Sequence, residues 1–403
     1  MLSKQALKEI LELIGESDGT FVILEKDSPR IAVLDFKVYE NLVNKAKYLK
    51  SLETHRQELP LKKDKVLFTG GAGRFGSAVV RALLTENYEV VIIDDLSKGD
   101  RARIPENVEF YEGDYRNQEL LSQIFENHKF DAVVHFAEKS GHLESAALPD
   151  EYMLSNVEGG LQFLKFLVKN EVSKVIYRSS FDCGSVYARS KILFEQVLNF
   201  YHHSFGLNSI ALRFPRIGCE IELAGVDPSV LVFEDPLQAV LNTAAGKANF
   251  MSVANVKEGS AEVELISQED AVSAVILAAD HLKTSSGSMV YSVPGTRTSL
   301  DNLIEAAMTV TNKMVPTMRA ADDGLWEIAS DEKIQSLEVL GFQNRLQDLE
   351  SLIKSYWLKT APPERLAGPA VVETYDERQL KEPVSLSELL SGRFTPFIKP
   401  HNS

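Results

Sequence analysis

A tyrosine and a lysine four residues apart, Tyr187 and Lys191, lie in a segment whose apolar spacing predicts a helix. An i, i+4 spacing places both side chains on one face of a helix. A free tyrosine has a pKa of roughly 10, and an ammonium group within ~4–6 Å lowers that pKa by favouring the phenolate. A tyrosine tuned in this way can exchange a proton with a hydroxyl group while a hydride moves to or from a nicotinamide. The pair therefore indicates redox chemistry at an alcohol carbon.

A serine close to this pair can hold the reacting oxygen atom. Residues 174–180 contain the apolar run 175–177 and predict a strand, and Ser180 lies at its carboxyl end. Open parallel sheets bind their ligands in the crevice outside the carboxyl ends of the strands. We therefore expect Ser180, Tyr187 and Lys191 to form one catalytic set.

Three glycines at the spacing G-x-x-G-x-x-G follow an apolar run at residues 66–68 and open a predicted helix at residues 77–84. In such a strand–turn–helix unit, Gly70 allows the tight turn, Gly73 lets the backbone approach a pyrophosphate, and Gly76 lets helix and strand pack closely. The amino end of the helix presents free N–H groups and the positive end of its dipole to the phosphates. The spacing predicts a dinucleotide-binding turn.

An acidic residue, Asp94, ends the next predicted strand, residues 89–93. An acid about 20 residues beyond the glycine turn can bind the hydroxyl groups of the adenosine ribose. The same carboxylate repels a 2′-phosphate, which favours NAD(H) over NADP(H) as the cofactor. Lys98, Arg101 and Arg103 lie nearby in the sequence and leave that preference open.

From residue 65 onward, strands alternate with helices, which is typical of an α/β fold with a doubly wound parallel sheet (Rossmann-like). We expect this NAD-binding domain to span residues 64–358, with a small C-terminal substrate subdomain mainly from residues 219–262 and 294–358. Residues 359–403 contain several prolines and predict an extended tail. Further strands are predicted at residues 108–114, 131–137, 209–214 and 288–293, and helices at residues 150–169, 187–201, 300–310 and 346–357.

Residues 1–58 form a separate small α+β module in which a helix, two strands and a second helix are expected. The stretch at residues 21–42 resembles the Phd/YefM family of antitoxins. That resemblance implies a dimer that binds DNA and a toxin. Acidic and basic residues are mixed through the module, so we do not carry DNA binding over, and a dimerisation or packing role is the simpler interpretation.

The charge of the chain limits its partners. The sequence has 403 residues, an apolar fraction of 44% and a formal net charge of −15, which argue for a packed core and against a nucleic-acid partner. No run of 18 apolar residues occurs, so we expect no membrane-spanning helix. Cys183 and Cys219 give neither a disulfide framework nor a zinc pattern, and no metal site is expected. We expect a cytoplasmic homodimer.

Taken together, residues 65–358 resemble the extended short-chain dehydrogenase/reductase family, in its NAD-dependent epimerase/dehydratase branch, and UDP-glucose 4-epimerase-like members in particular. The glycine turn, Asp94, the segment at residues 135–137 and the Tyr187–Lys191 pair carry the resemblance. It implies a bound NAD that transiently oxidises a carbon of a nucleotide-linked sugar, so the expected activity is that of a nucleotide-sugar epimerase or dehydratase.

The resemblance also implies roles for single residues. The implied cofactor-binding residues are Gly70, Gly73, Arg74, Phe75, Gly76, Asp94, Asp95, Asp114, Tyr115, Phe136, Ala137, Asn156, Lys191, Phe214 and Pro215. The candidates for contact with the substrate are Glu138, Asp182, Arg213 and Arg216.

Two departures from the family pattern lie close to the expected site. Only seven positions separate Ser180 from Tyr187, where family members usually carry a much longer loop, so Ser185 is an alternative source of the hydroxyl group. Glu138 replaces a small residue near the expected nicotinamide. A carboxylate there can stabilise the oxidised cofactor, act as a base or block a sugar, and the sequence leaves all three open.

Other departures concern the substrate. Arg216 stands where a substrate-binding asparagine is common, and residues 263–264 replace an Arg-Asp pair that would bind a nucleotide diphosphate. Asp182 is one acid where dehydratases carry an Asp-Glu pair. These departures, with the short loop and the N-terminal module, support an alternative: an NAD(H)-binding protein whose catalysis is degraded or altered, acting as a sensor or assembly partner.

Overall fold

The structure is a computed structural model that describes residues 20–25, 28–34, 63–181, 184–217, 236–254, 262–320, 334–345 and 348–360. The chain divides into two compact units, residues 1–63 and residues 64–403. Among the described residues, no helix has both the length and the apolar character that crossing a bilayer requires.

The described part of the first unit is a β-hairpin. Its strands β1 (Thr20–Glu25) and β2 (Ser28–Leu34) pair antiparallel, with Thr20 opposite Leu34. The two strands agree with the expected positions, whereas both expected helices lie outside the described residues. A hairpin alone does not establish the antitoxin resemblance.

The second unit is built on a sheet of eight strands in the order β15-β12-β8-β7-β6-β3-β4-β5, and all of its neighbouring strands pair parallel. The first strand of this sheet along the chain is β3, which lies inside the sheet. The next two strands, β4 and β5, extend the sheet on one side of β3, and β6 then pairs with its other side. This reversal point is where doubly wound sheets bind ligands. The predicted fold class is therefore confirmed. The strands are β3 (Lys65–Thr69), β4 (Glu89–Asp94), β5 (Glu109–Glu112), β6 (Ala132–His135), β7 (Lys174–Ser180), β8 (Asn208–Phe214), β12 (Ser288–Ser292) and β15 (Gln335–Ser336).

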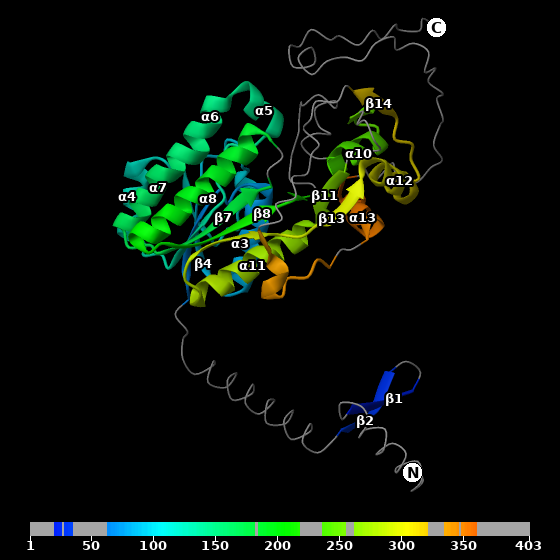
Figure 1. Cartoon of the computed structure of the whole chain (residues 1–403), viewed down its shortest axis with the longest axis horizontal. Helices are drawn as coiled ribbons and strands as arrows, with labels where there is room; N and C mark the ends of the chain where they lie inside the picture. The colour runs from blue at the N-terminus through cyan, green and yellow to red at the C-terminus, as the bar shows by residue number, and fades with distance from the viewer. Residues whose placement is uncertain are drawn as a thin grey trace, which may run out of the picture. The chain divides into compact units, whose positions relative to one another are not determined.

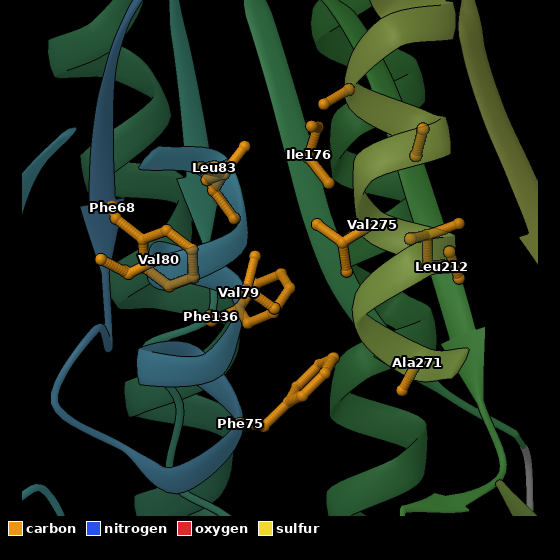
Figure 2. Packing of buried hydrophobic residues seen from close by; sticks show 14 of the residues in the cluster. Phe68, Phe75, Val79, Val80, Leu83, Phe136, Ile176, Leu212, Ala271 and Val275 are labelled. Atoms are coloured by element: carbon orange, nitrogen blue, oxygen red, sulfur yellow. The ribbon is translucent and has the colours of Figure 1, made fainter. Parts of the chain in front are cut away.

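Helices cover both faces of this sheet because successive side chains of a strand point to opposite faces. On one face, Phe68 of β3 packs in a core with α3 (Arg74–Thr85) and α11 (Gln268–Thr284). Figure 2 shows side chains of these two helices facing each other across this core. On the other face, Leu67 packs with the helices α4 (Gln118–Asn127), α7 (Gly160–Lys169) and α8 (Val186–Phe205).

A smaller group of elements with its own core gathers beside the sheet (Figure 1). Its helices contact one another, and Trp357 is buried among them. This separate core supports the expected substrate subdomain, although residues 218–235, 255–261 and 321–333 lie outside the described residues. The group contains α10 (Pro236–Ala244), α12 (Leu300–Thr311), α13 (Leu349–Thr360), the strands β9 (Arg216–Ile217), β11 (Glu262–Ile266) and β13 (Thr296–Ser299), and the pair β10 (Met251–Ala254) and β14 (Thr317–Ala320).

One expected helix is interrupted. The segment predicted as a single helix at residues 150–169 consists of α6 (Pro149–Met153), a π-helical turn η2 (Leu154–Gly159) and α7. A π-turn inserts extra backbone into a helix and occurs frequently at functional sites. It also escapes sequence patterns, because the apolar spacing on either side remains helical. The short helices α5 (His142–Ala147), η1 (Arg101–Arg103) and η3 (Leu337–Leu340) complete this unit as described.

Candidate active site

The glycine turn joins β3 to α3 at the reversal point of the sheet. Gly70 has a φ of +81°, and a Cβ atom there would lie 2.7 Å from the Ala137 nitrogen. A Cβ atom on Gly76 would lie 2.1 Å from the Gly70 oxygen. Helix α3 begins after Gly73 with no side-chain cap and no acidic residue in its first turn. Its N–H groups are thus available to an anion, which fits a pyrophosphate.

Substituting Gly76 by alanine is expected to weaken NAD binding at least about tenfold, because the added methyl group collides with backbone and the turn must shift. Isothermal titration calorimetry with NAD measures the change. The control is Gly206→Ala, at the carboxyl end of α8, where φ is +72° and no atom lies within 4 Å of an added Cβ. Equal affinity in the Gly76 variant and the parent would contradict this placement of the cofactor.

Asp94 connects the glycine turn to the loop that follows β4 through hydrogen bonds. Its carboxylate is 9% exposed and accepts hydrogen bonds from the Ala72 and Leu96 N–H groups, both at 2.9 Å. Burial raises the pKa of Asp94, against the effect of these two bonds. The neighbouring Asp95 is exposed and accepts two bonds from Ser97. The backbone around the glycine turn therefore fixes Asp94, whereas Asp95 is open to solvent.

The basic residues that left the cofactor preference open are engaged elsewhere. Lys98 donates a hydrogen bond to the Ser140 carbonyl oxygen at 2.6 Å. The Arg101 guanidinium lies 4.2 Å from the centre of the Phe110 ring. Engagement of these groups away from Asp94 favours NAD(H), since a 2′-phosphate needs a free cation.

Three aromatic residues among the expected cofactor residues pack together beside the glycine turn. Phe136 stacks on Phe75 at 5.4 Å, and Phe75 meets Phe214 edge-on at 5.4 Å. The Ala137 N–H donates to the Thr69 hydroxyl at 3.2 Å. Three aromatic rings from different elements thus form an apolar floor beside the glycine turn.

Asp114 and Tyr115 follow β5. Asp114 forms a bidentate pair with Arg116 that lowers the pKa of its carboxyl group against the effect of burial. Tyr115 is buried and donates to the Ser155 carbonyl oxygen in the π-turn at 2.8 Å, and burial raises its pKa. The Tyr115 hydroxyl is therefore directed toward the backbone of the π-turn η2.

Asn156 lies on the π-turn and fixes the backbone near Glu138. It accepts a bond from the Lys139 N–H at 2.8 Å and donates to the Lys139 oxygen and the Ser190 hydroxyl, both at 3.0 Å. Because Asn156 uses these bonds to hold the loop at Lys139, any effect of Asn156 on a bound cofactor passes through that loop. Ser190 belongs to α8, so the amide also couples this loop to the helix of Tyr187.

Tyr187 and Lys191 lie on one face of α8, as their spacing predicts, and both contact Glu138. The Tyr187 hydroxyl donates to Glu138 Oε1 at 2.7 Å, and Lys191 Nζ lies 2.5 Å from Glu138 Oε2. Arg178, on β7, lies 3.2 Å from Oε1. The Glu138 side chain is 4% exposed, so a buried carboxylate joins the tyrosine to two cations.

Charges and burial compete in this cluster. Burial raises the pKa of Glu138, but the charges of Arg178 and Lys191 outweigh it and keep that pKa below its ordinary value. Burial also lowers the pKa of Lys191, while Glu138 opposes that change. The ammonium group of Lys191 also lies 4.1 Å from the centre of the Tyr177 ring, which adds a cation–π contact.

The two serine candidates have different partners. Ser185 caps α8 by accepting a bond from the Ala188 N–H at 3.1 Å, and its hydroxyl lies 2.8 Å from His142 Nδ1. Ser180 donates at 3.2 Å to the carbonyl oxygen of its neighbour Phe181. Ser185 is therefore held as a helix cap, whereas Ser180 bonds to the backbone of its own neighbour.

Sequence reasoning missed His142. Its ring meets Tyr187 edge-on at 5.0 Å. Burial, followed by the charge of Arg216, lowers the pKa of His142 to about 3, so the imidazole is neutral. Arg216 is thus close enough to His142 for its charge to affect the imidazole. Arg178 and His142 lie outside the recognisable motifs, and no spacing rule points to either.

Arg213 differs from expectation. Its guanidinium forms two hydrogen bonds with Glu195 of α8, at 2.8 and 2.6 Å, and Glu195 also accepts a bond from Ser179. This buried pairing directs Arg213 toward α8, so we do not assign it to the substrate. Pro215 packs against Gly295, where an added Cβ atom would lie 3.0 Å from Pro215 Cγ. Asp182 lies outside the described residues.

Comparisons with known proteins agree with this architecture. UDP-glucose 4-epimerase of Halalkalibacterium halodurans is 29% identical over 323 residues, covering 72% of this chain and 94% of that protein. The enzyme of the same name from Streptococcus mutans is 28% identical over 326 residues, covering 72% and 95%. Among solved structures, UDP-glucose 4-epimerase from Brucella ovis in complex with NAD superposes with a TM-score of 0.61 at 25% identity, covering 73% of this chain and 98% of that one.

A second solved structure, the UDP-Glc/GlcNAc 4-epimerase of Campylobacter jejuni, gives a TM-score of 0.62 at 25% identity, covering 74% of this chain and all of that one. The sequence pattern of one family matches residues 66–293, which is more than half of the chain and contains both the glycine turn and the Tyr187–Lys191 pair. The chain belongs to the NAD dependent epimerase/dehydratase family.

Proposed function

We propose that this protein is an NAD-dependent nucleotide-sugar epimerase that uses Ser180, Tyr187 and Lys191. The observation that carries the proposal is that Tyr187 and Lys191 are buried together beside the carboxyl ends of β6 and β7. The curated relatives in the comparison are UDP-glucose 4-epimerases, which makes a UDP-hexose the first substrate to test. Dehydration needs a further acid, and the candidate for it, Asp182, lies outside the described residues.

The residues around the crevice fit NAD. When bound, NAD⁺ would accept a hydride from a sugar carbon and return it later. The glycine turn and the amino end of α3, including Arg74 and Phe75, would hold the pyrophosphate, and Asp94 and Asp95 the adenosine ribose. Asp114 and Tyr115 would border the adenine, whereas the aromatic floor, Ala137, Asn156 and Pro215 would border the rest of the cofactor.

Tyr187 and Ser180 would bind the same substrate oxygen atom. Proton transfer through a positioned tyrosine typically contributes about 10²–10⁴-fold to a rate. Arg216, whose charge acts on His142 beside Tyr187, is suited to a substrate phosphate, because arginine binds phosphate oxygens in a bidentate manner. Arg216 is therefore the substrate contact that we assign on the phosphate side.

The proposal is tested by purifying the full chain, denaturing it and measuring released NAD, and then following interconversion of UDP-glucose and UDP-galactose. We expect NAD to be recovered with the protein and turnover to proceed in both directions. A screen of other UDP-sugars extends the assay if these two are not substrates. Released NAD with no turnover on any nucleotide sugar would contradict the proposal.

One observation favours a second candidate, an NAD(H)-binding protein with altered catalysis. Glu138 and Arg178 place an additional charge pair beside Tyr187, and either side chain can obstruct a substrate. A protein of this kind would bind NAD without turning over a sugar and would act as a sensor or assembly partner. The assay above separates the two candidates, because only an epimerase interconverts the sugars.

The assembly and the domain boundaries also stay proposals. Exposed apolar side chains lie on the adjacent elements α6, η2 and α8, where Met153, Leu154, Leu193 and Phe200 are between 36% and 63% exposed. Exposed apolar residues of this kind mark protein–protein contacts, which supports a homodimer. We propose that the N-terminal hairpin belongs to a packing or dimerisation module.

A further inference from the structure

Glu138 makes three close polar contacts with side chains of α8 and β7. It lies in the loop that follows β6, and its two oxygen atoms meet the Tyr187 hydroxyl, the Lys191 ammonium group and the Arg178 guanidinium at 2.7, 2.5 and 3.2 Å. The Lys191 and Glu138 side chains are 1% and 4% exposed, so water does not screen these contacts. A carboxylate of a single residue thus contacts both members of the expected proton-transfer pair.

The environment of Glu138 carries more cationic than anionic charge. Two cations and one carboxylate give the immediate cluster a formal charge of +1 when Tyr187 is protonated. The titratable groups that face or influence this cluster are Tyr187, Lys191 and Glu195 of α8, Arg178 and Tyr177 of β7, His135 of β6, His142 of α5, Tyr115 after β5 and Arg216 of β9. Burial lowers the pKa of both His135 and His142 to about 3, so neither adds charge at neutral pH.

We propose that Glu138 is the proton acceptor for Tyr187: it takes the phenolic proton when Tyr187 takes the proton of the substrate hydroxyl, and it holds that proton until the substrate is reduced again. This inference rests on the proposed function, since it describes how the same site moves protons. Glu138 acts through Tyr187 and does not need to touch the sugar, so it is a positioning residue for proton transfer.

The direction of the Tyr187 hydrogen bond supports this path. A phenol carries one proton, and Tyr187 donates that proton to Glu138 Oε1. A phenolic oxygen can also accept a hydrogen bond, and in the proposed function that bond comes from the substrate hydroxyl. Before reaction, therefore, the substrate, Tyr187 and Glu138 can form a chain in which each member donates to the next. Such a chain lets both protons move without forming a phenolate beside a carboxylate.

The atoms and charges balance. In the oxidising half-reaction the carbinol C–H bond breaks with its electron pair, and the hydride goes to NAD⁺, the oxidant of the proposed function. The O–H proton goes to Tyr187, the Tyr187 proton goes to Glu138 Oε1, and a ketone and a neutral carboxylic acid result. The reducing half-reaction returns both protons and the hydride, so the site ends as it began.

The cations give the carboxylate its starting state. Arg178 and Lys191 hold Glu138 in its charged form despite burial, so it starts each cycle as a carboxylate, and its low pKa favours return of the proton to Tyr187 when the ketone is reduced. Without them, a carboxyl group this deeply buried would tend to be neutral. Their contacts also hold each carboxylate oxygen in place, which keeps Oε1 directed toward Tyr187.

The first test needs no substrate. Phenolate formation is followed by ultraviolet difference absorbance as the pH is raised, and each titration is repeated in a Tyr187→Phe background so that the difference isolates one of the 12 tyrosines. In Glu138→Gln we expect Tyr187 to lose its proton about 1–3 pH units lower than in the parent, because the adjacent negative charge is gone and both cations remain. The same midpoint in both proteins would overturn the inference.

The chain offers a matched control. Tyr111 donates to Glu109 Oε1 at 2.7 Å, the same distance as in the buried pair, but the Glu109 side chain is 52% exposed. Glu109→Gln removes an equivalent carboxylate from a tyrosine away from the expected catalytic set. We expect the Tyr187 midpoint to stay unchanged in this variant.

A second variant covers the case in which Glu138→Gln does not fold. Glu138→Gln combined with Arg178→Gln removes one negative and one positive charge, so the cluster keeps its formal charge of +1. Loss of the direct carboxylate contact is still expected to lower the Tyr187 midpoint. A midpoint equal to that of the parent in this double variant would also overturn the inference.

Kinetics supply the second readout. The parent is expected to show turnover that changes little between about pH 6.5 and 9, whereas turnover of Glu138→Gln rises about tenfold per pH unit until Tyr187 ionises, because the phenolate must then act as the base. A uniform loss at every pH would show a purely structural role and overturn the inference. If the parent itself does not turn over nucleotide sugars, the proposed function fails, and the substrate-free titration still decides the role of Glu138.

Discussion

Replacing Tyr187 by phenylalanine is expected to reduce turnover by about 10²–10⁴-fold while the protein stays folded and binds NAD. The substitution removes one hydroxyl group and keeps the ring. That ring meets His142 and Tyr152 edge-on at 5.0 and 6.3 Å, and the residue is only 5% exposed, so its packing survives. Glu138 keeps its contacts with Lys191 and Arg178, so no buried charge is left alone.

The measurement is the turnover number for nucleotide-sugar interconversion, with bound NAD and the unfolding midpoint determined in parallel. Tyr201→Phe is the matched control, since Tyr201 lies on the same helix α8, is also buried, and stands about 21 Å along the helix axis from Tyr187. Full activity in the Tyr187 variant would remove it from the catalytic set. Loss of both activity and folded protein would leave only a structural role.

The fold could be predicted because its determinants are local. The apolar run at residues 66–68, the three glycines and Asp94 lie within about 30 residues of one another and identify a strand–turn–helix–strand unit without any long-range information. Alternation of strands and helices then restricts the sheet to parallel pairing. The π-turn at residues 154–159 could not be found this way, since it changes the backbone without changing the apolar spacing.

The site could be predicted only in part, because its contacts join residues far apart in the sequence. The Tyr187–Lys191 pair depends on helical geometry alone, and the structure places both as expected. Glu138 stood out in the sequence as a departure from the family, but three roles were open. The structure narrows these roles because Glu138 contacts Tyr187 and Lys191, which lie 49 or more positions later in the chain. No spacing rule predicts a contact between residues so far apart.

The same limit applies to Arg213, whose buried partner the sequence did not indicate. A basic residue at the carboxyl end of a strand is suited to a phosphate, and Arg213 lies next to the end of β8. Arg213 instead turns toward Glu195, which is 18 positions earlier and on a helix. A strand alternates the direction of its side chains, so its pairing partner depends on which helix covers that face.

Glu195→Gln is expected to lower the free energy of unfolding by about 3–5 kcal/mol, because breaking a buried ion pair leaves the other charge without compensation. The Arg213 and Glu195 side chains are 6% and 1% exposed and joined at 2.6 Å, so solvent screens the pair little. The substitution keeps the size of the side chain, and Ser179 also loses its charged acceptor. Urea unfolding measures the change as a shift in midpoint.

The control for that measurement is Glu89→Gln, which removes a carboxylate that is 53% exposed and lies 3.5 Å from Lys65. Pairs of this kind contribute about 0–1 kcal/mol, so the midpoint should barely move. The decisive arm is Glu195→Leu combined with Arg213→Met, which removes both charges and keeps the volume apolar. Since replacing a whole buried pair is often neutral or stabilising, we expect this double variant to recover most of the lost stability. If it remains as unstable as Glu195→Gln, the loss comes from packing, and the charge argument is wrong.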